Sequence, residues 1–338
     1  MIRLRRLALA SVMCLLILGA SGAAEGATLL VRQDGTGDYT LIRPGISAAM
    51  NGDTVLVGPG EYYEPTIEIR KPVHLISEEG PIVTTIRMYS GWGMECVTVV
   101  YISDVTDPCT VEGFTIRGAR DGYADAGGGI SILRSKATIR NNIITDNWCS
   151  TGGGIYCSGD VPAVIEYNLI TLNEAVTGGG ITIYSGSHII RNNTIVYNWA
   201  SITDGGIRLY AEGIAGTIIA NNIIAKNESA SSGIGGVGGF ITEADIEFTC
   251  NDVWNNTPRN YQDSLQVMTG REGNISVDPL FCGEWQSGNY YLQAASPCTG
   301  PWCVDSCGVP YIGCYPVNCT TAAAERSWGG IKGLLRDR

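Results

Sequence analysis

Aromatic side chains and one arginine recur at matching positions of a repeated segment and could form a surface for a ring-shaped ligand. Their positions follow either the glycines or the asparagines of that repeat, and they are Tyr156, Tyr184, Tyr210, Arg208, Trp148 and Trp199. Tyrosine and tryptophan offer flat rings with one polar atom, which suits stacking against another ring. We therefore predict a ligand-binding face, although the two tryptophans could equally cover the loop side of the repeat.

Carboxylates accompany this face, but in the adjoining loops rather than on the strands. They are Asp121, Asp125, Asp146, Glu174, Asp204 and Glu228. Carboxylate oxygens are the ligands that Ca²⁺ prefers. Loop acids beside arginine and tyrosine could therefore form a calcium-binding groove, and solvated loop charge is the commoner alternative.

The segment that must position these residues runs over 139–155 and reads IRNNIITDNWCSTGGGI. Related segments begin at Ile165, Ile190 and Ile219, with a period of 25 to 29 residues. Each period carries three apolar positions, which predicts three short strands that point side chains inward. Short strands joined by sharp turns at this period predict a parallel β-helix, an all-β solenoid in which like residues stack on like.

The repeated asparagines, glycines and charges fit the same coil. One asparagine column is Asn142, Asn168, Asn193, Asn222 and Asn251, and a second is Asn147, Asn173, Asn198, Asn227 and Asn256. Asparagine tolerates left-handed bends, and stacked amides bond to one another, so we predict structural ladders rather than ligand contacts. Glycine triplets allow tight turns, and the alternating Glu112, Arg140, Glu166 and Arg191 predict ion pairs between coils.

The two ends of the chain predict export and a capped solenoid. Residues 1–24 combine three arginines, an apolar run and small residues, which is typical of a secretory signal peptide. The apolar run is too short to span a membrane. We assign 28–300 to the β-helix, with a short capping helix interrupted near Pro44 and Gly45. Residues 301–319 form a cysteine-rich closing segment, and 320–338 form a basic tail.

Charge and cysteine content narrow the possible partners. Loss of the three signal-peptide arginines from the 22 basic residues leaves 19 against 33 acidic ones, a net charge near −14. Such acidity argues against nucleic acid as a partner, and we expect a monomer. Eleven cysteines remain outside the signal peptide, and export favours disulfides over zinc. Plausible pairs are Cys96–Cys109, Cys149–Cys157 and Cys282–Cys298, with the connectivity left open.

With these repeats, the chain resembles the pectin lyase-like superfamily of right-handed parallel β-helix proteins. The Gly-Gly-Ile and Asn pattern is also similar to repeats of polymorphic outer-membrane proteins. The opening DGTGDYTLI and ISAAMNGDTVLVGPGEYYE resembles the cap helix and first coil of pectin methylesterases and exported β-helix proteins. The ending VDPLFC and YYLQAASPC looks like a terminal coil of the same bacterial group, so the resemblance covers roughly residues 28–320.

The resemblance implies carbohydrate-related activities, and the sequence lacks most of their motifs. The Gly-His-Gly of the glycosidases is absent, and YQDSL at 261–265 lies outside the repeats, without the companion motifs of the esterases. Calcium-dependent lyases resemble one another in carboxylates clustered on one strand face, and such a cluster is missing here. We therefore predict a non-catalytic exported protein that binds an extended polysaccharide or surface ligand. The alternative is a Ca²⁺-dependent polysaccharide lyase, with Arg208 as base and Asp204 among the calcium ligands.

Overall fold

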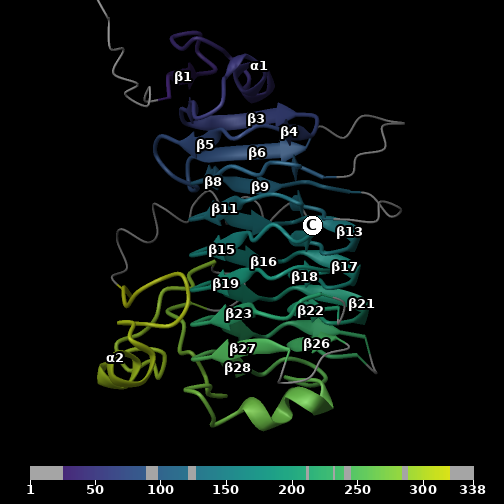
Figure 1. Ribbon diagram of the computed structural model, residues 1–338. Helices are drawn as coiled ribbons and strands as arrows, with labels where there is room; N and C mark the ends of the chain where they lie inside the picture. Colours follow the sequence, from purple (N-terminus) through teal and green to yellow (C-terminus); the bar gives the residue numbers. More distant parts are fainter. Residues whose placement is uncertain are drawn as a thin grey trace, which may run out of the picture.

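The computed structural model describes residues 26–88, 98–120, 127–210, 213–230, 233–239, 245–283 and 288–319. Short strands follow one another around a long coil axis, with the N-terminal end at the top of Figure 1. The proposed signal peptide and the basic tail lie outside the described residues. No described helix is long and apolar enough to span a membrane.

Three long parallel sheets form the walls of the coil. Sheet A contains β1 (Thr28–Val31), β2 (Thr54–Val57), β5 (His74–Ser77), β8 (Cys109–Glu112), β11 (Ala137–Arg140), β15 (Val164–Glu166), β19 (Ile189–Arg191), β23 (Thr217–Ala220) and β27 (Ile246–Thr249). Sheet B contains β3 (Gly60–Glu64), β6 (Thr84–Met88), β9 (Thr115–Arg117), β12 (Ile143–Thr145), β16 (Leu169–Thr171), β20 (Thr194–Val196), β24 (Ile223–Ala225) and β28 (Asp252–Trp254). Sheet C contains β4 (Ile67–Ile69), β7 (Val100–Ser103), β10 (Ile130–Leu133), β14 (Ile155–Ser158), β18 (Ile181–Ile183), β22 (Ile207–Leu209) and β26 (Val237–Gly239).

The strand register confirms the predicted parallel β-helix and its three apolar columns. Ile139 pairs with Ile165 in sheet A, and Ile144 pairs with Ile170 in sheet B. Ile155 pairs with Ile181 in sheet C. These side chains are fully buried in one continuous core that fills the coil. Stacked aliphatic residues therefore supply the main apolar burial of the molecule.

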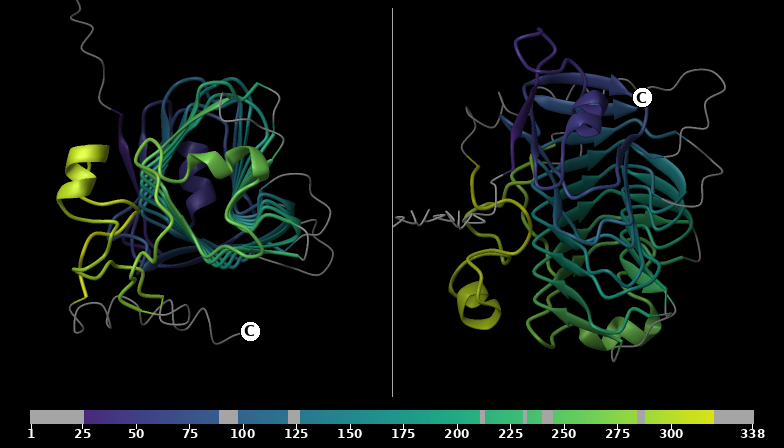
Figure 2. Two further views of the ribbon diagram at one scale, coloured as in Figure 1. Left: turned by 90° about the horizontal axis from the view of Figure 1, so that it is seen from below. Right: turned by 45° about the horizontal axis from the view of Figure 1, so that its top comes forward.

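A fourth, shorter sheet lies where the sequence predicts loops. Sheet D contains β13 (Trp148–Thr151), β17 (Glu174–Thr177), β21 (Trp199–Thr203) and β25 (Glu228–Ser229). Its strands pair in parallel, and β21 shifts register against β17. Seen along the coil axis, this stretch bulges beside the main outline as a lobe (Figure 2). The asparagine ladder before it and the glycine turn after it fix both ends of the lobe.

Both predicted asparagine columns form continuous hydrogen-bonded ladders at bends of the coil. Asn168 Nδ2 donates to Asn193 Oδ1 at 3.0 Å and to the Ile139 carbonyl at 2.8 Å. Asn173 Nδ2 donates to Asn198 Oδ1 at 3.0 Å and to the Ile144 carbonyl at 2.9 Å. The ladders continue to Asn274 and Asn260, which the repeat did not predict. The amides satisfy backbone groups that no strand pairs, as burial requires.

Close approach of successive coils explains the glycines between sheets D and C. A Cβ added at Gly154 would lie 2.5 Å from the carbonyl oxygen of Gly180 in the next coil. The first glycine of each triplet instead needs a left-handed backbone, with φ of 70° at Gly152 and 69° at Gly178. The predicted ion pairs also form: Arg140 Nη2 lies 2.7 Å from Glu112, and Arg191 Nη2 lies 2.7 Å from Glu166.

The capping helix α1 (Ile42–Ala48) closes the N-terminal end and is continuous, so the predicted interruption is wrong. Pro44 stands in the first turn, where its missing N–H leaves no hydrogen bond unmade. Gly45 lets the helix pack against Val31 and Val55. The buried Glu64 carboxylate accepts hydrogen bonds from the backbone N–H groups of Ile42 and Arg43.

The regular coils end at β28, and the rest of the chain covers two surfaces. The 3₁₀ helix η1 (Asp263–Met268) covers the C-terminal end of the core, where Leu265 is fully buried. The segment from Phe281 to Cys319, which includes α2 (Pro301–Cys307), folds back beside the solenoid (Figures 1 and 2). Its apolar residues pack on the outward side chains of sheet B, such as Leu169, Val196 and Ile223.

Two disulfides secure this C-terminal segment, and they differ from the plausible pairs. Cys250 bonds to Cys307, and Cys282 bonds to Cys319. The pairs Cys149–Cys157 and Cys282–Cys298 are wrong. Cys149 stacks with Ala175 inside the lobe, whereas Cys157 lies in the main core. Cys109 is a buried thiol, and its suggested partner Cys96 lies outside the described residues.

Candidate functional site

The bend between sheets B and D carries two outward columns of side chains on either side of the second asparagine ladder. The column after the ladder alternates in character, with Trp148, Glu174, Trp199 and Glu228 in parallel register on successive strands. The column before it contains Leu172, Tyr197 and Lys226, all with φ near 56°. The coil repeat therefore places tryptophan and glutamate in alternation along the axis, about 4.8 Å per step.

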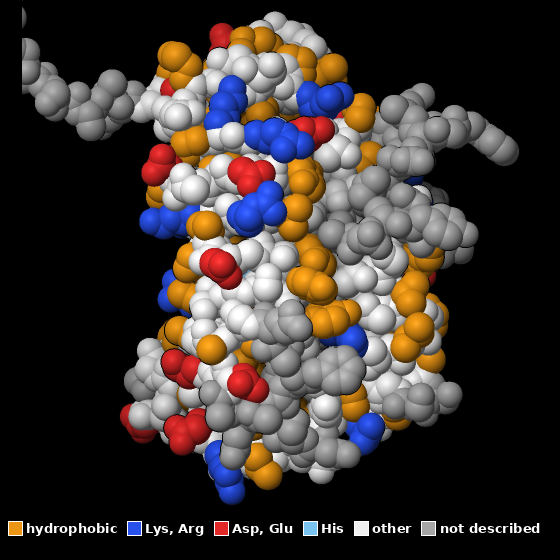
Figure 3. Space-filling view, turned by 45° about the vertical axis from the view of Figure 1, so that its right-hand side comes forward, with side chains coloured by type: hydrophobic (Ala, Val, Ile, Leu, Met, Phe, Trp, Pro, Cys, Tyr) orange, Lys and Arg blue, Asp and Glu red, His pale blue; other side chains and the backbone are white. Residues whose placement is uncertain are grey.

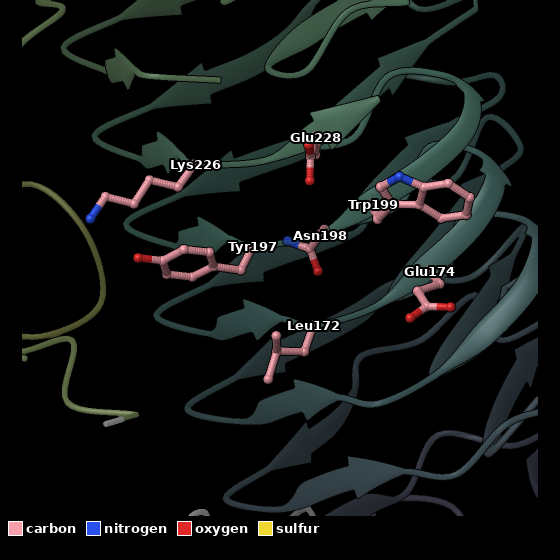
Figure 4. A pocket seen from close by; sticks show the side chains of 7 residues that line it. All are labelled: Leu172, Glu174, Tyr197, Asn198, Trp199, Lys226 and Glu228. Carbon is pink, nitrogen blue, oxygen red and sulfur yellow. The ribbon is translucent and has the colours of Figure 1, made fainter. Parts of the chain in front are cut away.

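A cavity of about 410 Å³ lies between these columns, and we call it the corner groove. Its lining residues are Leu172, Glu174, Tyr197, Asn198, Trp199, Lys226 and Glu228 (Figure 4). Asn198 is a buried member of the ladder, so the wall behind the groove is held by hydrogen bonds from coil to coil. Trp199 is 38% exposed, which leaves much of its side chain available to a ligand.

The charged groups of the corner groove divide between its two sides. Glu174, Trp199 and Glu228 lie on one side, while Tyr197 and Lys226 point the other way (Figure 4). The Lys226 ammonium lies 5.6 Å from the ring centroids of both Tyr197 and Trp254. Cation–π attraction of this kind holds the lysine on the far side. The side that carries Trp199 is consequently acidic and aromatic.

The three predicted tyrosines form a second feature, a stack on the outer face of sheet C. The ring centroids of Tyr156 and Tyr184 are 6.1 Å apart, and those of Tyr184 and Tyr210 are 4.9 Å apart. Tyr184 is 47% exposed, whereas Tyr156 is only 8% exposed. Burial raises the pKa of Tyr156 to about 12, which keeps its hydroxyl protonated. Tyr184 thus offers most of the accessible ring surface in this stack.

Arg208 and Asp204 contact each other beneath this stack. Arg208 Nη1 donates a hydrogen bond to Asp204 Oδ2, with 2.5 Å between the two atoms. The guanidinium lies 4.5 Å from the centre of the Tyr210 ring. Asp204 is 1% exposed and Arg208 is 8% exposed. Burial raises the pKa of Asp204, and the guanidinium opposes that shift. The geometry is that of a buried ion pair whose guanidinium packs against the Tyr210 ring.

Asp204 takes a place that glycine fills in the earlier coils. Its φ is 65°, against 70° at Gly152 and 69° at Gly178. Aspartate tolerates this left-handed conformation better than most residues. Its side chain reaches toward Gly238, where an added Cβ would lie 2.0 Å from Asp204 Oδ1. Since Gly238 pairs with Arg208 in sheet C, the glycine leaves space for the carboxylate beside the arginine.

The structure does not gather the predicted residues into a single site. Trp199 lines the corner groove together with Glu174 and Glu228, and none of the three tyrosines lines it. Trp148 lies one coil before Glu174, toward the N-terminal end of the solenoid, and its strand neighbour there is Arg120. The sequence reasoning missed Leu172, Tyr197 and Lys226, although each precedes a ladder asparagine by one residue. That spacing was the signal that could have identified them.

The loop acids are dispersed among different partners. Asp146 forms ion pairs with Arg117 and Arg120, and Asp204 pairs with Arg208. Asp121 and Asp125 lie outside the described residues. Within the described ranges, no group of three or more His, Cys, Asp or Glu side chains could hold a metal ion.

A buried thiol and imidazole meet in the core but have structural partners. Cys157 Sγ lies 3.4 Å from His188 Nδ1, which also accepts a hydrogen bond from the Ala163 N–H. His188 Nε2 faces the Ser185 carbonyl at 2.9 Å, so it carries the proton of the neutral ring. Burial lowers the pKa of His188 and raises that of Cys157. Both groups are thereby kept neutral, and the pair links neighbouring coils.

Figure 3 shows the side chains on the face of the molecule that carries sheets C and D. Hydrophobic side chains run along the coil axis, and Lys and Arg gather toward the N-terminal end. A second cavity, of about 350 Å³, lies there beside α1 and includes Arg43, Arg70 and Lys71. Arg70 bonds to Glu68 and Ser103, and Lys71 bonds to carbonyls at the end of α1. Lys71 therefore secures the end of α1, whereas Arg70 is held by side chains of sheet C.

A comparison with protein-family models agrees with the β-helix fold. Residues 84–276, more than half of the chain, match the family model described as "Right handed beta helix region". No curated protein matches the sequence. Among solved structures, the chain is similar to pectin methylesterase PemA from Erwinia chrysanthemi, with 17% identity and a TM-score of 0.44. That likeness covers 70% of this chain and 80% of the other.

Proposed function

The chain belongs to the right-handed β-helix family, and from that premise we propose that it binds an extended polysaccharide without cleaving it. The observation that carries this proposal is the corner groove beside the exposed Trp199. Sugar rings present apolar C–H faces and hydroxyl rims. A tryptophan flanked by carboxylates offers a stacking surface together with hydrogen-bond acceptors for such a ring.

The coil repeat favours a long ligand over a small one. Trp148 and Trp199 occupy the same column two strands apart, which is about 9.6 Å at about 4.8 Å per strand. Glu174 lies between them and Glu228 lies beyond Trp199. A polymer aligned with the coil axis would meet tryptophan and glutamate in turn. The Tyr184 ring on sheet C offers a further contact surface to a chain that reaches around the lobe.

Export fits this role. Two disulfides favour an oxidising compartment, and the acidic composition suits a protein outside the cell. We propose a secreted, periplasmic or cell-surface protein that works as a monomer.

The alternative is a Ca²⁺-dependent lyase with Arg208 as base and Asp204 as a calcium ligand. A base must reach the proton that it removes. Arg208 is largely buried and bonded to Asp204, so both groups would have to separate before either could serve catalysis. This arrangement supports the binding role over the lyase.

Retention of the protein in native gels that contain dissolved polysaccharides tests the binding role. We expect retardation by at least one polymer, and Trp199→Ala should weaken it by up to about tenfold, since a stacked ring pair contributes about 0.5–1.5 kcal/mol. Tyr63→Ala is the matched control, because Tyr63 is an exposed ring on sheet B, away from the groove. Equal weakening by both variants, or no retardation by any polymer, would contradict the proposal.

An absorbance assay separates binding from cleavage. The protein is incubated with acidic polysaccharides and Ca²⁺, and unsaturated products are followed in the ultraviolet. We expect none. Product release that disappears in Arg208→Ala would establish the lyase in place of the binding protein.

A further inference from the structure

We propose that the outer face of sheet B carries a binding site for one small oxyanion, such as sulfate or phosphate, next to the buried side chain of Arg117. The site lies in the N-terminal half of the solenoid, on β6 and β9 (Figure 1). It is separate from the corner groove and does not depend on the proposed polysaccharide binding. A buried guanidinium with an unbonded donor, beside a second guanidinium, carries the proposal.

The strand alternation places two arginines side by side on this face. Ile86 and Ile116 pair in register and fill the core, so their neighbours Arg87 and Arg117 point outward. The two arginines are themselves register partners, on strands about 4.8 Å apart. Like charges directly opposite each other on neighbouring strands are destabilising, so this pair requires negative charge nearby.

Arg117 is buried without the partners that a buried charge requires. Its side chain is only 4% exposed, and its Nε atom has no hydrogen-bond partner among the residues that the structure describes. The carboxylate that pairs with it is distant, because Nη2 lies 3.7 Å from Asp146 Oδ2, beyond hydrogen-bonding length. An unsatisfied donor in the interior is costly, and buried charges are normally paired and hydrogen-bonded. A further acceptor beside Arg117 would remove that cost.

The carboxylates near Arg117 are bonded to other arginines. Asp146 accepts a hydrogen bond from Arg120 Nη2, and Glu61 lies 3.4 Å from Arg87 Nη1. Three guanidinium groups therefore share two carboxylates, which leaves one positive charge in excess within this cluster of described residues. Burial lowers the pKa of Arg117, and the charge of Arg87 lowers it further. Both effects are those of a cation without full compensation.

An oxyanion suits this cluster in shape, charge and size. A guanidinium presents planar N–H donors that match the oxygens of phosphate or sulfate. The side chains of Arg87 and Arg120 are 36% and 48% exposed, so an anion can approach the cluster from solvent. The cover over Arg117 restricts the bound group to a small one. Since the chain has a formal net charge of −11, general attraction would not bring an anion here, and binding must be local.

Equilibrium dialysis of the full chain against radiolabelled phosphate, at constant ionic strength, tests the site. We expect a single bound phosphate per chain, which unlabelled sulfate displaces. Arg117→Met keeps a side chain of similar length but removes the donors, and it should weaken binding by about tenfold or more. Arg140→Met is the matched control, because it removes the same charge from an exposed arginine that pairs with Glu112 on sheet A.

Thermal melting provides a second readout. Phosphate well above its Kd should raise the melting temperature of the original protein by about 2–4 °C. Because phosphate and sulfate also stabilise proteins in general, the shift is compared between Arg117→Met, which should gain less, and Arg140→Met, which should gain as much as the original. Without phosphate, Arg117→Met should melt above the original protein, since it removes an incompletely paired charge from the interior.

A second variant and a second ligand complete the test. Arg87→Met, at a more exposed position, should also weaken phosphate binding and serves if Arg117→Met fails to fold. Tighter binding of phenyl phosphate than of inorganic phosphate would indicate a group carried by a larger molecule, and weaker binding would indicate a free ion; either supports the oxyanion site. No bound phosphate, unchanged binding in both variants, or equal loss in Arg140→Met would overturn it.

Discussion

At the scale of single residues, Asp204 shows how one substitution in a repeat creates a local ion pair. The preceding coils carry glycine at this left-handed position and Thr182 or Tyr156 at the position of Arg208. Asp204 and Arg208 depart from that pattern together, and each is buried against the other. A buried pair contributes little net stability, but loss of one partner is costly because a charge is left behind in the interior.

Removal of Asp204 alone should therefore destabilise the coil more than removal of both residues. Asp204→Gly leaves the buried Arg208 without its carboxylate and should lower the free energy of unfolding by about 3–5 kcal/mol. The double variant Asp204→Gly, Arg208→Thr restores the Gly178 and Thr182 pattern of the preceding coil and should recover most of that loss. Urea denaturation followed by circular dichroism measures both. A single variant as stable as the double would contradict a buried, mutually dependent pair.

At the scale of elements, the asparagine ladders and sheet D define the lobe that carries the corner groove. The ladders could be predicted because five asparagines recur at one spacing, and stacking follows from the repeat. Sheet D could not be predicted, because its strands share no apolar alternation: they read WCST in β13, EAVT in β17 and WASIT in β21. Their pairing depends on the bends at either end of each strand. Trp199 could be identified because it follows a ladder asparagine. Its groove neighbours Tyr197 and Lys226 could not be placed beside it, because their position relative to Trp199 depends on the unpredicted bend into sheet D.

The second ladder should be the feature on which this lobe most depends. Asn173→Ala removes the donor to the Ile144 carbonyl and the acceptor for the N–H of Asn147, in the buried middle of the stack. At about 1–3 kcal/mol for each buried group left unsatisfied, the loss should be about 2–6 kcal/mol. Asn51→Ala, at an exposed turn, is the control and should change stability by less than about 0.5 kcal/mol. Chemical denaturation of both variants would show a difference, and equal stability would refute the structural role of the ladder.

At the scale of the whole molecule, the C-terminal segment converts an open sheet face into a second small core. Outward residues of sheet B pack against Phe281, Tyr290 and Leu292. The Cys250–Cys307 disulfide joins the last coils to α2. The sequence identified the cysteines but not their pairing, because the path by which this segment folds back follows no repeat. Asp252, on the last strand of sheet B, lies at the boundary between the coil and this segment.

Asp252 should make the attachment of this segment weaken as the pH rises. Its carboxylate accepts the Val277 N–H at 3.1 Å and lies 3.2 Å from Cys298 Sγ. Burial raises its pKa from 3.8 to about 7, and nearby Asp278 adds to the shift. The folded protein therefore holds a proton that the unfolded chain has already lost, so stability falls from about pH 4 to about pH 7 and then levels. At about 1.36 kcal/mol for each pH unit in that window, the total is on the order of 4 kcal/mol.

The variant Asp252→Asn should remove this pH dependence, because the amide oxygen can still accept from Val277 without a charge to bury. We expect its melting temperature to exceed that of the original protein at pH 8 and to match it near pH 4, in differential scanning calorimetry at several pH values. Asp278→Asn, at the exposed neighbour, serves as the control and should change the slope only slightly. A pH slope that persists in Asp252→Asn would place the titrating group elsewhere. If the slope disappears in this variant, protonation of Asp252 is what stabilises the contact between the coil and the C-terminal segment at low pH.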